Sequence, residues 1–509
     1  MSRFAKRVRV LSLLLSLLPV VGMAKGLEQP LIFVQEPLEP TACGSRIAAL
    51  QPDGDIRLLT EGFCAAAEPT VSFDGRRVLF AGKLHAGENW DVWEMDVNGS
   101  RKMRVTSDMG DCREPVYLAM AAVDAPNFRD KVRWIAFTST ASDAIDEQGR
   151  GPLASLYAMS LTPVPGRGTV VWRTGYNLGG DLAPTTLADG RVLFSSWQRQ
   201  GFALMTISWA GENLNPFFGS HDKTTSQLSA CELPGERLLV FVEGEGDAED
   251  RSGRLAQVSF RRPLNSYRAL SRGEGRYRTP QGLADGRLLV AYARGGDSYG
   301  IYLFDEKKGM AGKKVFDAAD WHDVDPQPAV ARPEPIGRIP MVEFASVLDV
   351  GGFKEAGQLQ CLNVYESDRE ESEQVRPGEA KKVRLVEGLP LTLEEGQRLL
   401  RKQERGRDDG AWPPPFVATR SLGEAPVEED GSFYVNVAGN VPFYVEILDG
   451  KGEVVTAMRS WMWVRSGDQR GCIGCHEDKE MAPENRVTEA LVKAQPTMLL
   501  GPRRQGKGE

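Results

Sequence analysis

The sequence predicts an all-β protein: a six- or seven-bladed β-propeller followed by a small antiparallel β-sandwich-like domain. Three observations support this fold class. Short apolar segments recur about every 50 residues, tight-turn dipeptides precede most of them, and turn-bounded strands continue beyond a proline-rich break. The chain has 509 residues, of which 41% are hydrophobic and 26% charged. This composition excludes a wholly disordered or fibrous chain, and the length suggests two to four domains.

The repeating unit of the propeller contains two kinds of strand. Apolar strands occur at 78–80, 134–137, 192–194, 238–241 and 288–290. Asp-Gly or Pro-Gly turns precede most of them, at 74–75, 189–190, 234–235 and 285–286, and X-Pro pairs open several repeats, at 68–69, 114–115, 183–184 and 279–280. Alternating strands follow at 90–95, 156–159, 202–205 and 301–304. We expect the apolar strand of each blade to lie near the central channel, and we expect residues 31–60 to form a further blade.

The first 24 residues have the pattern of a secretory signal peptide. Basic residues precede an apolar run at 10–21, and Gly22 and Ala24 supply the small residues of a cleavage site after Ala24. The run is short for an uncleaved anchor, which needs about 20 apolar residues. The sequence therefore predicts an exported protein, periplasmic in a bacterium, without a membrane span after cleavage. Its formal net charge of −8 argues against a nucleic-acid partner.

A proline-rich segment at 325–335 separates the two predicted domains. We expect the propeller over 31–325, the second domain over 336–490 and a flexible tail over 491–509. Strands of the second domain are predicted at 359–365, 382–386, 432–437, 443–448 and 454–464. An amphipathic helix is predicted from Thr392 to residue 405, with Thr392 as its N-cap.

The strongest chemical signal is Cys-x-x-Cys-His at Cys472, Cys475 and His476. Two thiols at this spacing can each add to a vinyl group of one haem, and the adjacent imidazole can then ligate the iron. Export supplies the compartment in which such attachment occurs. The sequence contains four histidines, too few for several haems with paired histidine ligands, so we expect one covalent haem c per chain.

Two alternatives compete for this motif. The cysteine pair could be half of a zinc site, although the sequence has no second Cys-x-x-Cys pair. It could also be a dithiol redox motif, although that motif normally occurs in a thioredoxin-like β/α context.

The residues around the motif bear on its environment. Trp461 and Trp463 would share one face of a strand, where they could contact a porphyrin or form part of the sandwich core. Glu477, Asp478 and Glu480 would place negative charge beside the motif and favour oxidised iron. Histidine and methionine side chains are the candidates for the ligand on the opposite side of the iron. They are His85, His221, His322, Met458, Met462 and Met481.

Five further cysteines lie outside the motif. Cys43 and Cys64 flank a short β segment and could form a disulfide, which would close a loop of about 20 residues. Cys112 and Cys231 each open a propeller repeat, either as small buried residues or as metal ligands. Because the total of seven is odd, the cysteines cannot all form intramolecular disulfides.

With these motifs the chain resembles the hydrazine synthase alpha-subunit family, and its repeats resemble the TolB-like propellers. The resemblance extends over nearly the whole mature chain and is carried by 187–197, 362–367, 423–433, 459–461 and 471–477. It implies an N-terminal propeller followed by the family's middle domain, which carries a c-type haem.

Two departures from the family pattern bear on activity. The synthase subunit has a further domain with a second, bis-histidine haem, whereas this chain ends about 30 residues after its motif. In the synthase a tyrosine shortly after the motif is thought to ligate the iron, while the motif histidine helps to bind zinc with a propeller cysteine. Glu480 corresponds to that tyrosine here, so we expect His476 to be the iron ligand and hydrazine not to be the product.

The sequence therefore supports two functions. The first is an exported monohaem c-type cytochrome, a redox protein or haem-dependent oxidoreductase that meets a redox partner or a small nitrogenous or other redox substrate. The second is a non-catalytic periplasmic binding or scaffold protein with a structural or sensory haem.

Overall fold

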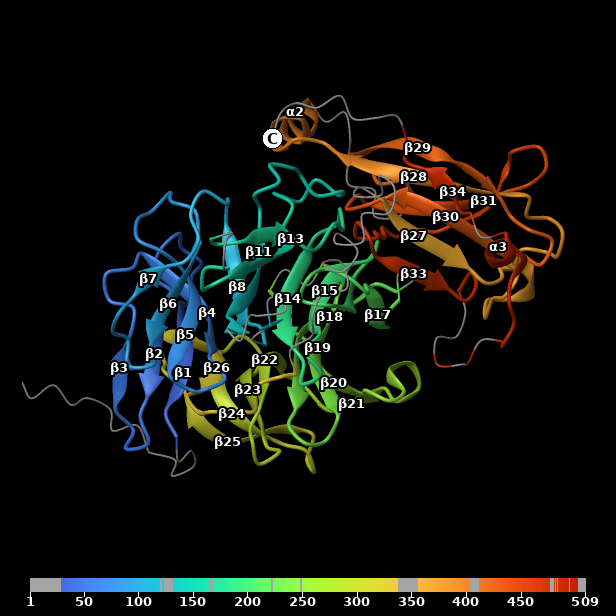
Figure 1. Ribbon diagram of the computed structural model, residues 1–509. Helices are drawn as coiled ribbons and strands as arrows, with labels where there is room; N and C mark the ends of the chain where they lie inside the picture. The colour runs from blue at the N-terminus through green and yellow to red at the C-terminus, as the bar shows by residue number, and fades with distance from the viewer. Residues whose placement is uncertain are drawn as a thin grey trace, which may run out of the picture.

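The computed structural model describes residues 29–119, 121–122, 131–164, 168–220, 223–247, 250–336, 356–402, 412–476, 480, 482, 484–493 and 495–501. The predicted signal peptide, His221, Glu477, Asp478 and Met481 lie outside this part. The described chain forms a β-propeller, at the left of Figure 1, and a β-sandwich, at the right.

Six four-stranded sheets of the described chain are the propeller blades. Blades 1 to 3 contain β26 (Trp321–Pro328), β1 (Leu31–Pro37), β2 (Arg46–Leu50) and β3 (Ile56–Leu58); β4 (Ala65–Val71), β5 (Arg77–Lys83), β6 (Asp91–Asp96) and β7 (Met103–Arg104); and β8 (Cys112–Tyr117), β11 (Trp134–Ser139), β12 (Ser155–Ser160) and β13 (Val171–Arg173). A separate strand pair, β9 (Ala121–Ala122) and β10 (Lys131–Val132), lies between β8 and β11 in the sequence.

Blades 4 to 6 repeat the same order. They contain β14 (Asp181–Thr186), β15 (Val192–Trp197), β16 (Phe202–Ile207) and β17 (Asn215–Phe218); β18 (Thr225–Leu233), β19 (Leu238–Glu245), β20 (Arg254–Ser259) and β21 (Arg268–Ala269); and β22 (Arg276–Gly282), β23 (Leu288–Ala293), β24 (Gly300–Asp305) and β25 (Met310–Phe316). A short 3₁₀ helix, η1 (Pro263–Asn265), connects β20 to β21. The predicted blade count is thus resolved to six.

The strand nearest the channel is not the apolar one, so that expectation was wrong. The apolar strands are β5, β11, β15, β19 and β23, each second in its blade, where neighbouring blades cover both faces. The innermost strands β26, β4, β8, β14, β18 and β22 contact one another around the ring. Each of them has a register shift and a residue at positive φ; these residues are Glu68, Glu114, Ala183, Ser229, Thr279 and Asp325. Such bulges re-aim side chains, and all six residues line the channel.

The last propeller strand completes the first blade. β26 pairs antiparallel with β1, which joins the two ends of the propeller in one sheet (Figure 1). The expected domain boundary at residue 325 therefore falls inside a strand, and the propeller extends to Pro328. Beside this closure, Cys43 and Cys64 form the disulfide that their spacing suggested, with their Cα atoms 4.8 Å apart.

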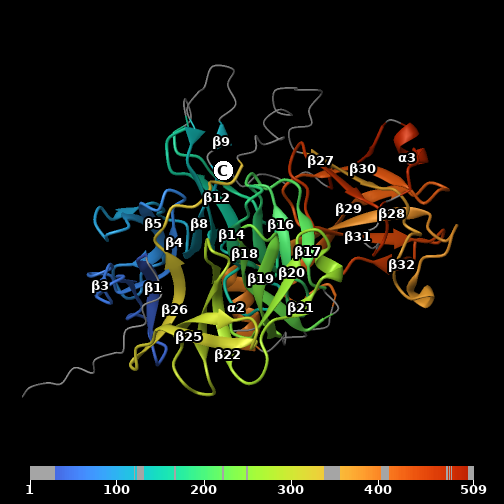
Figure 2. The same ribbon diagram turned by 90° about the horizontal axis from the view of Figure 1, so that it is seen from below.

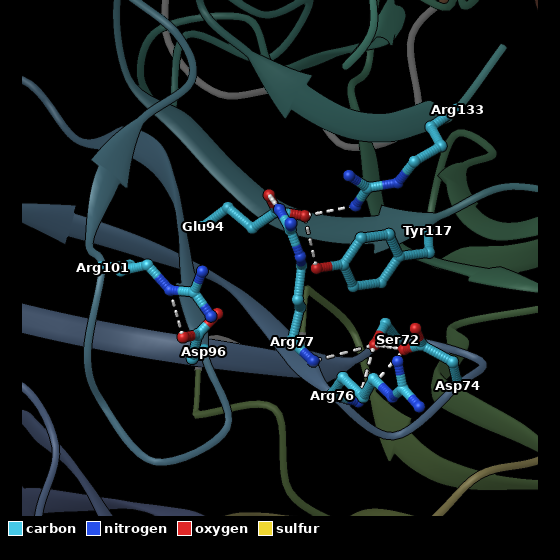
Figure 3. A network of polar contacts seen from close by, with 9 residues as sticks. All are labelled: Ser72, Asp74, Arg76, Arg77, Glu94, Asp96, Arg101, Tyr117 and Arg133. Carbon is cyan, nitrogen blue, oxygen red and sulfur yellow. Dashed lines mark hydrogen bonds and ion pairs between the residues drawn. The ribbon is translucent and has the colours of Figure 1, made fainter.

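A buried carboxylate connects blades 2 and 3. Glu94 on β6 is 3% exposed and accepts hydrogen bonds from Arg77 Nη1 at 2.6 Å and from the Tyr117 hydroxyl at 2.9 Å (Figure 3). Arg133 pairs with the same carboxylate. Burial and the nearby Glu94 charge raise the pKa of Tyr117 well above its ordinary value, so its hydroxyl remains a donor at neutral pH.

Two four-stranded sheets form the sandwich around one apolar core. They consist of β33 (Gln469–Cys472), β27 (Ala356–Cys361), β30 (Phe433–Ala438) and β34 (Thr497–Leu499), and of β29 (Val417–Pro426), β28 (Lys382–Pro390), β31 (Phe443–Leu448) and β32 (Val454–Ala457). Short helical segments are η2 (Glu371–Glu373), α2 (Leu393–Lys402) and α3 (Glu489–Val492).

Three details of this domain differ from the sequence expectations. The sandwich is not wholly antiparallel, because β33 and β34 run parallel to β27 and β30 after long connections. The strand predicted over 454–464 ends at Ala457, beyond which Trp461 and Trp463 pack toward the propeller. The expected tail contributes β34, whose Leu499 is buried in the core.

Helix α2 begins where the sequence predicts. The Thr392 backbone N–H donates to the Glu395 carboxylate at 3.0 Å, and the Glu395 N–H donates to Thr392 Oγ1 at 3.2 Å. This reciprocal pair is a capping box. The helix ends at Lys402, and residues 403–411 lie outside the described chain.

Candidate functional site

The Cys-x-x-Cys-His motif begins on the edge strand β33 of the sandwich. β33 pairs parallel with β27, and Cys472 lies opposite Cys361 in the register. The backbone then continues along the loop that follows β27. Asn363 N–H donates to the Ile473 carbonyl at 3.0 Å, and Asp368 N–H donates to the His476 carbonyl at 2.9 Å. The motif is therefore held by its backbone along a neighbouring chain segment.

The side chains of the motif lie at the rim of the sandwich core. Cys472 and Cys475 are half-buried and pack against this core, and His476 is also half-buried. Gly474 allows the loop to approach closely, because a Cβ atom there would lie 2.3 Å from the Glu366 carbonyl oxygen. The Cys475 N–H donates to that same carbonyl at 2.9 Å. The three residues that the sequence selected thus lie at the rim of the sandwich core, beside the loop that follows β27.

Contacts on both sides of the motif hold it against the propeller. Before the motif, Asp468 Oδ2 accepts the Asn213 N–H at 3.2 Å, and Arg470 donates to the Leu214 carbonyl. Residues 213 and 214 precede β17 of blade 4, which lies below β33 in Figure 1. After the motif, Glu480 contacts η1 of blade 5. The motif therefore lies in a segment that is fixed at both ends to neighbouring blades.

Glu480 is the stronger of these anchors. Its carboxylate accepts hydrogen bonds from Arg262 Nε at 3.0 Å, the Leu264 N–H at 2.6 Å and Asn265 Nδ2 at 2.7 Å. Burial alone would raise the pKa of Glu480, but the hydrogen bonds from these three residues outweigh it and lower the pKa below its ordinary value. Glu480 is thus an ionised contact to the propeller, a role that sequence reasoning missed.

Trp461 and Trp463 pack between the two domains rather than only within the sandwich. Trp461 is 3% exposed and packs with Leu178 of the propeller and Tyr444 of the sandwich. Its Nε1 donates to the buried carboxylate of Glu147. Trp463 lies in the apolar cluster of blades 3 and 4, where its ring is 6.1 Å from that of Tyr176. The two tryptophans form the apolar part of the domain interface described here, and nothing in the sequence pattern indicated Glu147 as a partner.

Burial raises the pKa of Glu147 to about 7, while the Trp461 hydrogen bond and Arg150 act in the opposite direction. The side chain is 1% exposed, so its ionisation is costly at the interface. A carboxyl group whose pKa is higher in the folded than in the unfolded protein stabilises the fold at pH values below its unfolded-state pKa. This contribution is lost as the pH rises through its folded-state pKa.

We therefore expect Glu147→Gln to flatten the pH dependence of stability between pH 4.5 and about 7. The amide oxygen can still accept from Trp461, but the variant has no charge to desolvate. At pH 8 the gain should be at most about 3 kcal/mol, the free energy of the pKa shift. Thermal unfolding of both proteins from pH 4.5 to 8 measures it; parallel curves for the two proteins would contradict the expectation.

The other described ligand candidates lie in two places, the histidines in the propeller and the methionines in the sandwich core. His85 is exposed in the β5–β6 loop of blade 2, and His322 on β26 accepts the Tyr299 N–H through Nδ1 at 3.1 Å. Met462 is buried in the same core against which Cys472 and Cys475 pack, and Met458 is half-buried beside it.

The propeller cysteines lie inside their blades. Burial raises the pKa of Cys112 to about 11 and that of Cys231 to about 12, which keeps both thiols protonated. Among the residues that the structure describes, no group of three or more His, Cys, Asp or Glu side chains is arranged to hold a metal ion. Nor does any helix in the described ranges have the length and apolar character needed to cross a membrane.

The fold and the site together define a class of protein: a six-bladed propeller fused to a β-sandwich whose edge strand carries Cys-x-x-Cys-His at the domain contact. Residues 378–477 match the model of the hydrazine synthase alpha subunit middle domain. The chain is 28% identical to hydrazine synthase subunit alpha of Kuenenia stuttgartiensis over 510 residues, which cover 85% of this chain and 62% of that protein.

Solved structures are also similar to this chain. Hydrazine synthase of Kuenenia stuttgartiensis matches with a TM-score of 0.78 and 25% identity, covering 92% of this chain and 71% of that chain. TolB from Acinetobacter baumannii matches with a TM-score of 0.40 and 12% identity, covering 59% and 67% of the two chains. These matches relate the chain to the hydrazine synthase alpha subunit, whose middle-domain model covers residues 378–477. It spans 62% of the length of the curated relative.

Proposed function

We propose that this chain is an exported monohaem c-type cytochrome that acts as a redox protein or oxidoreductase. Cys472 and Cys475 would attach one haem c, and His476 would ligate its iron. The observation that carries the proposal is the complete Cys-x-x-Cys-His motif on the edge strand of the family's middle domain, in a segment fixed at both ends against the propeller.

The residues present fit a covalent haem. The two thiols are half-buried at the rim of an apolar core, and the backbone around them is fixed by β27 and the loop after it. Two sulfurs for attachment and one imidazole for iron are the donors that such a haem requires. When bound, the haem would supply one-electron chemistry. The chain's own residues would orient it and exclude water on the sandwich side.

We also propose that the chain does not make hydrazine. The resemblance places an iron-ligating tyrosine of the synthase at the position of Glu480. The Glu480 carboxylate is already bonded to three donors of blade 5, and an ionised carboxylate so satisfied is a poor candidate for moving to iron. His476 therefore remains the proposed axial ligand, and we expect the electrons to pass to a redox partner protein or a small redox substrate.

A second candidate is a non-catalytic binding or scaffold protein with a structural or sensory haem. The observation that favours it is the large charged cavity in the propeller, which is independent of the motif. The two candidates differ in the state of the haem iron: catalysis needs an open coordination position, whereas transfer or a structural role favours an iron with both axial positions filled.

The test is expression with and without the first 24 residues in a bacterium that matures c-type cytochromes, followed by denaturing electrophoresis and haem staining. Only the exported chain should stain. Spectra of the native protein with and without carbon monoxide then separate the candidates, because a ligand-sensitive five-coordinate haem favours an oxidoreductase and an insensitive six-coordinate haem favours the alternatives. An exported chain that does not stain would refute the cytochrome proposal.

A further inference from the structure

The central channel of the propeller is a charged cavity that the proposed haem chemistry does not use. Its volume is about 1850 Å³, and it is lined by the innermost strands of all six blades. Among the described residues, nine carboxylates and six arginines line it, without a lysine. The lining thus carries an excess of negative charge.

The innermost strands of the six blades form a ring around the channel. Two acidic side chains of this ring bind the backbone of the neighbouring blade. Glu68 Oε2 accepts the Glu114 N–H at 2.7 Å, and Glu114 Oε2 accepts the Ala183 N–H at 2.8 Å. Each of these residues occupies the positive-φ position of its strand. At that position, the acidic side chain of one blade therefore binds the backbone of the next.

Three of the cavity arginines are also matched by carboxylates. Arg113 pairs with Glu68 at 2.6 Å, and Arg251 pairs with Glu114. Arg278 pairs with Glu36 at 2.9 Å. These three pairs have no net charge. Among the positive-φ positions of the innermost strands, they leave one further acidic side chain.

Asp325 is that unmatched group. It occupies the same positive-φ position on β26, and its backbone N–H donates to Thr279 Oγ1 at 3.1 Å. Within the described residues its carboxylate accepts no hydrogen bond, unlike those of Glu68 and Glu114. Burial raises the pKa of Asp325 to about 7, with Glu36 and Glu68 adding to the effect and Arg278 and Arg251 opposing it.

A second polar group in the cavity lacks a partner. The Tyr299 side chain is 5% exposed, lines the cavity and stacks with Arg278, whose guanidinium carbon is 5.4 Å from the ring centre. Its hydroxyl is buried without a hydrogen-bond partner in the described chain. The Asp325 carboxylate and the Tyr299 hydroxyl, which can donate or accept a hydrogen bond, are therefore both available to a bound molecule.

The two mouths of the channel differ. At one mouth, residues 329–336 extend from blade 2 to blade 4: Arg332 N–H donates to the Phe73 carbonyl at 2.8 Å, and a Cβ atom on Gly190 would lie 2.2 Å from the Ile336 carbonyl oxygen. This segment narrows that mouth. The other mouth is lined by Trp90, Tyr299 and His322. A ligand would therefore enter past an aromatic rim.

We propose that the propeller channel is a binding site for a small organic amine, with its ammonium group on the Asp325 carboxylate and its hydrocarbon part against the prolines of the inner strands. An ammonium group supplies both the charge and the hydrogen-bond donors that Asp325 lacks. Prolines 69, 115, 184 and 280 give the ring an apolar surface between its charged groups. A compact divalent cation fits less well, because Arg251 and Arg278 act on the Asp325 carboxylate with the same sign of charge as the cation.

The test is calorimetric titration of the full mature protein with 1,4-diaminobutane and, separately, with succinate, which has the same number of carbons but opposite charge. We expect binding of the diamine only. Asp325→Asn should weaken it at least tenfold, whereas Asp305→Asn, which removes a carboxylate that does not line the channel and is paired with Lys308 at 3.4 Å, should leave it unchanged. Diamine affinity should also fall as pH is lowered through about 7, because Asp325 is then protonated while the amine keeps its charge.

Two controls keep the result interpretable. Because the Asp325 carboxylate accepts no hydrogen bond in the described chain, Asp325→Asn should unfold at or above the wild-type temperature, which separates lost binding from lost folding. A variant without the haem-attachment cysteines should bind the diamine like wild type, since the channel is separate from the motif. Equal diamine affinity in wild type and Asp325→Asn, no diamine binding by wild type, or preferential binding of succinate would overturn the proposal.

Discussion

Replacing both Cys472 and Cys475 with serine is expected to abolish covalent haem completely. Serine cannot form a thioether with a vinyl group, so the exported variant should lose all haem staining after denaturation. Cys475→Ser alone should already prevent stable haem retention. The half-buried position of both thiols at the rim of the sandwich predicts that the variants still fold, because serine is close to cysteine in size.

The matched control for this prediction is Cys231→Ala. Cys231 lies inside blade 5, and burial raises the pKa of its thiol to about 12, so it is unsuited to haem attachment. This variant should carry as much haem as wild type. Full haem occupancy in the double serine variant would show that the motif is not the attachment site, and equal loss in all variants would point to a folding defect.

Trp461→Ala should be the most destabilising single substitution at the domain interface, at about 3–5 kcal/mol. The substitution removes a ring that packs between Leu178 and Tyr444, and it leaves the Glu147 carboxylate buried without its donor. Gly388 on β28 shows how closely this ring fits, because a Cβ atom there would lie 2.6 Å from Trp461 Cζ3. The cavity left by alanine cannot be filled by a small shift.

Thermal unfolding and limited proteolysis measure this effect. We expect a lower unfolding temperature in Trp461→Ala and earlier cleavage between the propeller and the sandwich. Trp461→Phe, which keeps an apolar ring but not the hydrogen bond to Glu147, should be intermediate. Trp321→Ala is the control for loss of a half-buried tryptophan outside the interface. A Trp461→Ala protein as stable as wild type would show that the domains are held together elsewhere.

The propeller could be predicted because its repeats are local in sequence. Each apolar strand and its turn lie within a few residues of each other, so their recurrence indicates blades directly. The order of strands from the channel outward could not be read in this way. An apolar run shows only that both faces of a strand are covered. The strand β5 meets this condition as the second strand from the channel, and it would meet it equally well as the first. Closure by β26 depends on pairing with β1, nearly 300 residues earlier.

The same distinction applies to the candidate site. Cys472, Cys475 and His476 are contiguous, so their spacing carries the signal without a structure. Glu147 and Trp461 are 314 residues apart, and Glu480 is 216 residues from Leu264. A single acidic residue has no pattern that identifies a partner at such a distance. The acidic residues near the motif suggested an effect on the haem, whereas Glu480 serves as a contact to blade 5.

The absorption spectrum of the purified exported protein, oxidised and reduced, tests the central claim most directly. The account predicts the spectrum of a c-type haem at one per chain, retained after denaturation and extraction with acidified acetone, and absent from the chain with Cys472 and Cys475 replaced by serine. A folded, exported wild-type protein without haem absorption, or with haem that the solvent removes, would contradict the account.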